Sequence, residues 1–314
     1  GRWERASIGG VSQFSAVAWF FAEALQKQLK TPIGVICPAV GGTPTESWVS
    51  RDSLTNHPTL QSLVRGNWLD NSRLSDFCRE RGEENLLSAI QAGEFIPGDD
   101  LGPNHSFKPA FMWQATIEPL IPFAIRGVSW YQGESNAESA ARAREQAELL
   151  PLLIQSWRKA WAQGDFPFLL VQLPAHNRPD WPLFREVQRR VQQTVPNVEM
   201  AVTMDVGDLS NVHPRNKRPV GRRLAGLALG QTYSVKGESL YAGPMLENVT
   251  AKGNAIVLKF KYVGTGLKAT DGLPLRHFEV AAEDGKFVPA MARCVERDLV
   301  QVESSQVLKP QEVR

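Results

Sequence analysis

The side chains that could carry chemistry gather in three short stretches of the sequence, at residues 40–48, 131–136 and 205–214. Each stretch follows a short apolar run of the kind that forms a buried parallel strand. In an open α/β sheet, ligands bind in the crevice beyond the carboxyl ends of the strands. The three stretches therefore predict one shared site, with a histidine, a serine and turn-forming glycines among its components.

The first stretch contains two adjacent glycines, Gly41 and Gly42. Such a pair lets the backbone turn sharply and present its N–H groups, which is what an oxyanion hole requires. A glycine pair that only makes a turn has the same sequence. Both interpretations stay open on the pattern alone.

The second stretch mimics a nucleophile elbow, because residues 133–137 read Gly-Glu-Ser-Asn-Ala between a predicted strand and a predicted helix. The elbow pattern is G-x-S-x-G, and Ala137 replaces its last glycine. Ser135 could thus be a nucleophile. Alternatively, Ser135 or Asn136 caps the helix that begins near Glu138.

The third stretch offers a base for such a serine. Of the five histidines, only His176 and His213 follow predicted strands. His213 has two carboxylates upstream, Asp205 and Asp208, which could orient an imidazole. A histidine on a loop can equally be a plain surface residue.

The elements that would position these residues alternate along the chain. Helical spacing of apolar residues predicts helices at 15–29, with Ser15 as N-cap, and at 138–161, 183–195 and 219–229. Apolar runs predict strands at 33–37, 125–130, 168–173 and 200–204. We expect Cys37, within the first run, to be a buried structural thiol. The alternation predicts an α/β fold with a doubly wound parallel sheet.

The character of the sequence changes near Lys236. Short β-prone runs follow, such as residues 256–260 and 299–302, separated by glycine-containing turns. We therefore predict two domains, residues 1–235 and an antiparallel β-rich region at 236–314. Residues 57–110 are expected to form a helical excursion and a long loop bordering the site.

Composition narrows the function classes. The 35 basic and 33 acidic residues nearly cancel, which argues against a nucleic-acid partner. No apolar stretch approaches the roughly 20 residues of a membrane span. The three cysteines are too scattered for a disulfide framework or a zinc site. A neutral or weakly anionic small substrate fits this balance.

Taken together, the motifs resemble the sialate O-acetylesterase family, a carbohydrate esterase branch of the SGNH hydrolases. The resemblance covers nearly the whole chain and rests on residues 14–21, 32–36, 41–48, 108–109, 117–121, 130–137, 213–217 and 220–224. It implies an SGNH-type sheet in three α/β/α layers, followed by an additional β region.

The resemblance also implies roles for individual residues. Gly42 would supply a backbone N–H and Gln132 a side-chain N–H to the oxyanion, and His213 would be the base. Glu134 matches the motif and would support the site by orienting its loop. Ser135 would be a neighbour of the site instead of its nucleophile.

The triad acid departs from the usual pattern. SGNH enzymes commonly carry an aspartate three residues before the histidine, and that position is Ser210 here. Asp208 is the nearest carboxylate and the predicted orienting acid, with a Ser-His dyad as the alternative.

In the family, the nucleophilic serine lies in a Gly-Gln-Ser-Asn-Met segment, which this sequence lacks. The family pattern places that segment before Gly1 and further β structure after Arg314. We therefore expect the chain to be an interior fragment, with the serine supplied by a companion segment or chain.

The function implied is serine acyl transfer on acetylated sugars, with sialic acid as the expected sugar and with no metal or cofactor. The sugar would lie against Trp48 or Trp113, and the location would be secreted, periplasmic or lysosomal. Two alternatives remain: a non-catalytic carbohydrate-binding module, and an elbow-type hydrolase that uses Ser135.

Overall fold

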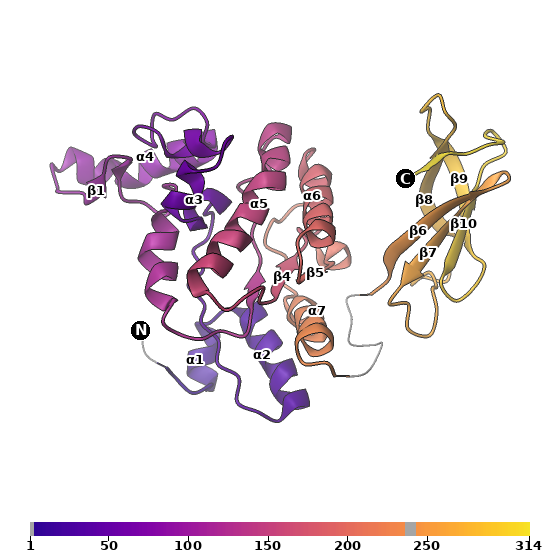
Figure 1. Ribbon diagram of the computed structural model, residues 1–314, viewed down its shortest axis with the longest axis horizontal. Helices are drawn as coiled ribbons and strands as arrows, with labels where there is room; N and C mark the ends of the chain where they lie inside the picture. The colour runs from indigo at the N-terminus through magenta and orange to yellow at the C-terminus, as the bar shows by residue number, and fades with distance from the viewer. Residues whose placement is uncertain (1–2, 236–242) are drawn as a thin grey trace. The chain divides into compact units, whose positions relative to one another are not determined.

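The computed structural model describes residues 3–235 and 243–314 (Figure 1). The chain divides into two compact units, Gly1–Tyr233 and Ser234–Arg314. The predicted second domain begins at Lys236, which lies outside the described residues. The assignment of two domains with those limits therefore stays a prediction, and each unit is described by itself.

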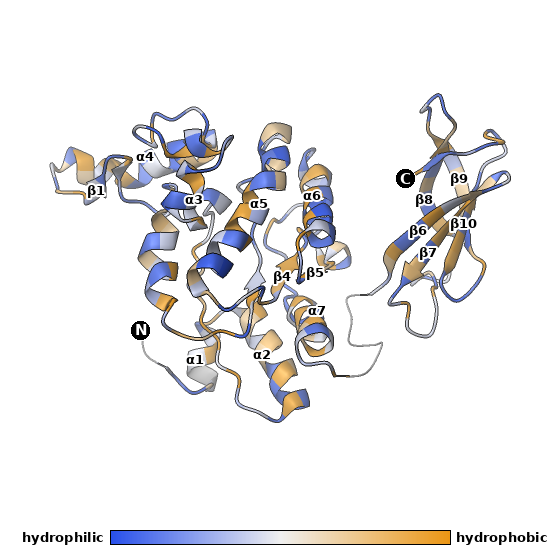
Figure 2. Cartoon of the chain, viewed as in Figure 1, coloured by the Kyte–Doolittle hydropathy of each residue, from blue (hydrophilic) through white to orange (hydrophobic). Residues whose placement is uncertain are grey.

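A parallel three-stranded sheet forms the centre of the first unit. Its order is β3-β4-β5, with β3 at Val128–Trp130, β4 at Phe168–Val171 and β5 at Val198–Ala201. Val128 pairs with Phe168, which pairs in turn with Val198. All four residues of β4 are buried, as a central strand requires, and Figure 2 shows its apolar colouring. The predicted mixed α/β fold with a parallel sheet is confirmed.

The predicted strand at residues 33–37 is wrong. This segment belongs to no strand in the described part of the chain, and Ile36 is 39% exposed. Cys37, expected to be buried, is exposed as well. An apolar run becomes a strand only where a neighbouring strand accepts its backbone hydrogen bonds, and sequence composition does not reveal whether one is present.

The predicted helices lie close to their expected positions. α2 covers Ala16–Leu29, and the Ser15 hydroxyl caps it by accepting a hydrogen bond from the Ala18 N–H at 3.3 Å. α5 covers Ala140–Trp161 and is capped by Ser139, so neither Ser135 nor Asn136 is its cap. α6 and α7 cover Trp181–Thr194 and Arg218–Leu227. α7 packs on β4, β5 and α2, while α6 packs on β5 and α5.

The region between α2 and β3 consists of short elements around one longer helix, α4 (Asp76–Gln91). Gly82 lies so close to the Trp68 ring that an added Cβ would meet it at 2.1 Å, which fixes α4 against the core. The other elements of this unit are α1 (Ile8–Ser12), η1 (Thr45–Trp48), α3 (Arg51–Thr55), η2 (Gln61–Val64), β1 (Gly98–Asp99), β2 (Gly102–Pro103), η3 (Trp113–Ile117), η4 (Glu118–Leu120), η5 (Met204–Val206) and η6 (Ala228–Thr232).

The second unit is a curled antiparallel sheet with strand order β11-β8-β9-β10-β7-β6. Alternate residues of these strands, among them Ile256, Val280 and Val302, form its buried core. The strands are β6 (Met245–Lys252), β7 (Ala255–Lys261), β8 (Leu275–Ala281), β9 (Val288–Cys294), β10 (Leu299–Glu303) and β11 (Glu312–Val313).

Helices that could span a bilayer were sought among the described residues, and none is both long and apolar enough.

Candidate active site

The Gly41-Gly42 turn has the geometry that its sequence suggested. Gly42 adopts a φ of +77°, a left-handed conformation that favours glycine. The Phe107 ring lies against it, so that a Cβ on Gly42 would sit 3.2 Å from the ring. The Thr43 hydroxyl closes the turn by donating to the Val40 carbonyl at 2.8 Å. Backbone conformation and close packing therefore both require glycine here.

Gln132 joins this turn to the loop after β3. Its Nε2 donates to the Thr43 carbonyl at 3.1 Å and to the Asn136 Oδ1 at 2.7 Å, and its Oε1 accepts from the Thr45 hydroxyl at 2.8 Å. Gly42 and Gln132 are thus neighbours. Because both Nε2 hydrogens already have acceptors, donation to an oxyanion requires one of these bonds to be exchanged.

Ser135 also contacts the glycine turn. It is buried, and its hydroxyl donates to the Gly42 carbonyl at 2.7 Å. An elbow nucleophile instead gives its proton to a histidine. Through the observed bond, Ser135 connects the two loops. This bond does not fit the elbow interpretation.

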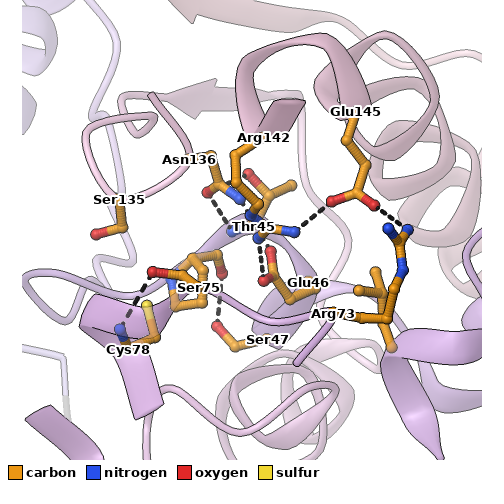
Figure 3. A network of polar contacts seen from close by, with 12 residues as sticks. Thr45, Glu46, Ser47, Arg73, Ser75, Cys78, Ser135, Asn136, Arg142 and Glu145 are labelled. Atoms are coloured by element: carbon orange, nitrogen blue, oxygen red, sulfur yellow. Dashed lines mark hydrogen bonds and ion pairs between the residues drawn. The ribbon is translucent and has the colours of Figure 1, made fainter. Parts of the chain in front are cut away.

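A buried ion pair lies beneath these loops (Figure 3). Glu46, with no exposed surface, accepts hydrogen bonds from the Arg142 guanidinium and from the Asn136 Nδ2, the latter at 3.0 Å. Asn136 Oδ1 in turn accepts from the Thr45 N–H at 2.9 Å. These contacts join residues about 90 positions apart and hold the glycine turn against the β3–α5 loop. We call Thr45, Glu46, Asn136 and Arg142 the buried polar network.

The ion pairs of the buried polar network extend to two further charged residues. Arg142 bonds Glu145, which pairs with Arg73 at 2.7 Å near the surface. Burial raises the pKa of the Glu145 carboxyl, and the neighbouring Arg142 charge opposes that rise. Sequence reasoning missed Arg142, because an arginine on an amphipathic helix gives no signal that it will be buried.

The loop after β3 meets the segment that follows His213 through Tyr131 and Lys217. Burial raises the pKa of the Glu134 carboxyl, while backbone N–H groups and the charges of His213 and Lys217 act to lower it. Lys217 Nζ lies 5.1 Å from the centre of the Tyr131 ring, and burial lowers the pKa of this lysine. Gly133 is also required, since a Cβ there would lie 2.4 Å from the Phe184 ring. The Tyr131–Lys217 contact therefore places the loop after β3 beside the segment that follows His213.

The predicted orienting acid, Asp208, has a different set of contacts. Its Oδ1 accepts from the Ser210 N–H, the Ser210 hydroxyl and the Asn211 N–H, at 2.8 to 3.0 Å. These bonds lower the pKa of the Asp208 carboxyl. Its backbone carbonyl lies 3.1 Å from His176 Nδ1. The described bonds of this carboxylate thus shape the loop, and none of them reaches His213.

His213 itself is exposed, and its N–H donates to the Asn211 Oδ1 at 2.9 Å. The structure links the three stretches pairwise: the Gly42 turn contacts Gln132 and Ser135, and Tyr131 faces Lys217, four residues after His213.

The two tryptophans that were predicted to contact the sugar are buried in the structure. Trp48 is 4% exposed and Trp113 is 7% exposed. Trp48 Nε1 donates to the Thr43 hydroxyl at 2.9 Å, and its ring packs edge-on against Trp130. Trp48 therefore fits a supporting role below the glycine turn and leaves no free ring face for a sugar.

Comparison with known proteins agrees with this arrangement of motifs. The model of the family "Carbohydrate esterase, sialic acid-specific acetylesterase" matches residues 111–229. Sialate O-acetylesterase of Rattus norvegicus is 32% identical over 282 residues, which are 81% of this chain and 49% of the rat protein. The Homo sapiens enzyme is 29% identical over 281 residues, 82% of this chain and 47% of the human protein. The chain thus spans about half the length of these curated relatives.

One solved structure aligns with the whole length of this chain. A carbohydrate acetylesterase from Xanthomonas citri matches with a TM-score of 0.77 at 29% identity, over 100% of this chain and 62% of that one. The order of motifs, the family match and this structural likeness agree with one another. Residues 111–229 thus match a carbohydrate esterase family, and the chain is similar over most of its length to sialate O-acetylesterases and to a carbohydrate acetylesterase.

Proposed function

We propose that the chain carries most of the active site of a carbohydrate O-acetylesterase that hydrolyses acetyl esters on sugars, with acetylated sialic acid as substrate. The observation that carries this proposal is that the Gln132–Ser135 segment bonds the Gly42 turn, while the adjacent Tyr131 ring faces Lys217, four residues after His213. The family and its relatives support the choice of substrate.

In the proposed mechanism, His213 takes the proton of a nucleophilic serine, which attacks the acetyl carbonyl. Water then hydrolyses the acetyl-enzyme. Gly42 N–H and Gln132 Nε2 stabilise the oxyanion in both steps, Gln132 by exchanging its bond to Thr43 or Asn136 for one to the substrate.

We assign the stabilisation of the charged His213 imidazole to Glu134. Glu134 lies on the loop whose Tyr131 faces Lys217 after His213, whereas the carboxylate of Asp208, the acid favoured on sequence, is engaged by Ser210 and Asn211. Asp208 shapes the loop that presents the base.

The nucleophilic serine, in this proposal, arrives on a further strand that completes a three-layer SGNH sheet. Two features support the presence of such a strand. Among the described residues β3 pairs only with β4, which leaves its other edge open, and residues 33–40 expose Ile36 and Val40. Open strand edges and exposed apolar runs are ordinarily covered in folded proteins. The strand could belong to the same polypeptide or to a companion chain.

The family also supports a secreted, periplasmic or lysosomal location, which we include in the proposal on that ground alone.

The experiment is to incubate the complete protein with a serine-directed phosphonate and to map the adduct, alongside acetate release from O-acetylated sialic acid. We expect loss of acetate release together with an adduct on a serine outside the described residues. An adduct on Ser135 would overturn the assignment of the nucleophile. A protein that binds the sugar, releases no acetate and takes up no phosphonate would be a binding module, which would overturn the proposed function.

A further inference from the structure

An aromatic surface lies beside the glycine turn, on the side formed by α4. Phe107 packs against Gly42, and its ring centre lies 6.2 Å from that of Phe77 in the first turn of α4. Phe107 is buried, whereas Phe77 is 49% exposed. Phe77 is therefore partly open to solvent, one ring away from the proposed oxyanion donor.

Several contacts hold the loop that carries Phe107 in place. His105 packs edge-on against Phe107 with ring centres 4.8 Å apart, and it stacks on the buried Trp68. Lys108, itself 2% exposed, anchors the same loop by donating to the Gly102 carbonyl and the Asn104 Oδ1, each at 3.0 Å. The loop that carries Phe107 is thus fixed on two sides.

The helix that carries Phe77 is fixed as well. Ser75 caps α4 by accepting from the Cys78 N–H at 3.2 Å, and its hydroxyl donates to Glu138 at 2.7 Å. Figure 3 shows Ser75 and Cys78 beside the segment that carries Thr45 and Glu46. The first turn of α4 is therefore bound to the active-site loops.

We propose that Phe77 is a substrate-positioning residue whose exposed face packs against the apolar face of a pyranose ring while the acetyl group occupies the site beside Gly42. This inference rests on the proposed function and names the residue that selects for sugars. Aromatic rings suit this task because they bury large area at low entropic cost and remain rigid when backed by a second ring. Trp48 and Trp113, being buried, cannot do so.

The test compares Phe77→Leu and Phe77→Tyr with Phe123→Leu in the complete protein. Leucine preserves apolar contact with Phe107 and removes the flat face, tyrosine keeps the face, and Phe123 is a comparably exposed phenylalanine at 51%. We expect Phe77→Leu to raise KM for an acetylated sugar by about 3- to 15-fold with little change in kcat. Its kcat/KM for ethyl acetate, which has no ring, should stay within about twofold of the wild-type value. Phe77→Tyr and Phe123→Leu should match the wild type on both esters.

A second readout does not depend on turnover. Binding of the deacetylated sugar, measured by calorimetry, should weaken by a similar factor in Phe77→Leu alone. Unchanged sugar binding and unchanged KM in Phe77→Leu would overturn the inference while leaving the esterase proposal intact. Equal losses on the sugar ester and on ethyl acetate would also overturn it, because they would show a general structural role. Absence of acetate release from the wild type would count against the proposed function instead, with calorimetry still deciding the role of Phe77.

Discussion

The two sides of the candidate active site are built differently. The side formed by the Gly42 turn and the Gln132–Ser135 segment is joined by the buried polar network, with bonds between residues about 90 positions apart. The side that carries His213 is an exposed loop shaped by local hydrogen bonds that the Asp208 and Asn211 side chains accept from backbone N–H groups. Oxyanion donors act best when fixed before the reaction, whereas a base must be accessible to a proton. The difference teaches that the proposed oxyanion donors depend on buried contacts between distant segments, whereas the proposed base depends on local bonds, and this separation can be tested.

The largest effect is expected for His213→Ala. If the exposed loop contributes chemistry and little packing, kcat for acetate release should fall by about 10³- to 10⁴-fold while the free energy of unfolding stays within about 0.5 kcal/mol of the wild type. Steady-state kinetics and urea denaturation of the complete protein measure the two quantities. His176→Ala is the matched control and should retain most activity. Similar losses in both variants would reject His213 as the base.

Arg142→Met, unlike His213→Ala, should strongly lower the free energy of unfolding. It leaves the Glu46 carboxylate buried without its cation, and breaking a buried pair in this way costs about 3–5 kcal/mol. Arg73→Met removes another arginine of the same chain of contacts, but its side chain is 53% exposed and the expected loss is at most about 1 kcal/mol. Urea denaturation measures both losses. Equal losses would show that burial of the network does not set its strength.

The smallest effect concerns pH. Burial raises the pKa of Glu134 above its ordinary value of 4.5, so the folded protein favours the protonated carboxyl. Stability from this group is present below about pH 4.5 and is lost as the pH rises through the higher folded pKa. The melting temperature of the wild type should therefore fall between about pH 4 and about pH 7 relative to that of Glu134→Gln, in which this position does not titrate.

Glu186→Gln supplies the control of opposite sign. Hydrogen bonds from Arg189 and Arg190 lower the pKa of Glu186 to about 2, so its contribution is present above about pH 4.5 and is lost as the pH falls towards 2. The variant should lose at most about 1 kcal/mol at about pH 7, because the pair lies at the surface. Shifts of the same sign in both variants would contradict the assigned burial of Glu134.

Much of the fold could be predicted because its signals are local. The largely apolar run at 168–173 contains β4, and the helical spacing at 138–161 became α5 with a serine cap. The strand predicted at 33–37 failed because pairing depends on a neighbour that composition does not reveal.

The sequence by itself determined the three stretches of candidate site residues and the likeness to a carbohydrate esterase family, because both depend on residue type and spacing. Only the tertiary structure decided that Arg142 pairs with Glu46 in the interior, that Trp48 lies beneath the site and that Phe77 faces outward beside it. The tertiary structure also left the Asp208 carboxylate bonded within its own loop and placed Tyr131 against Lys217. Burial and hydrogen-bond partners arise from contacts between distant segments, so no local pattern encodes them.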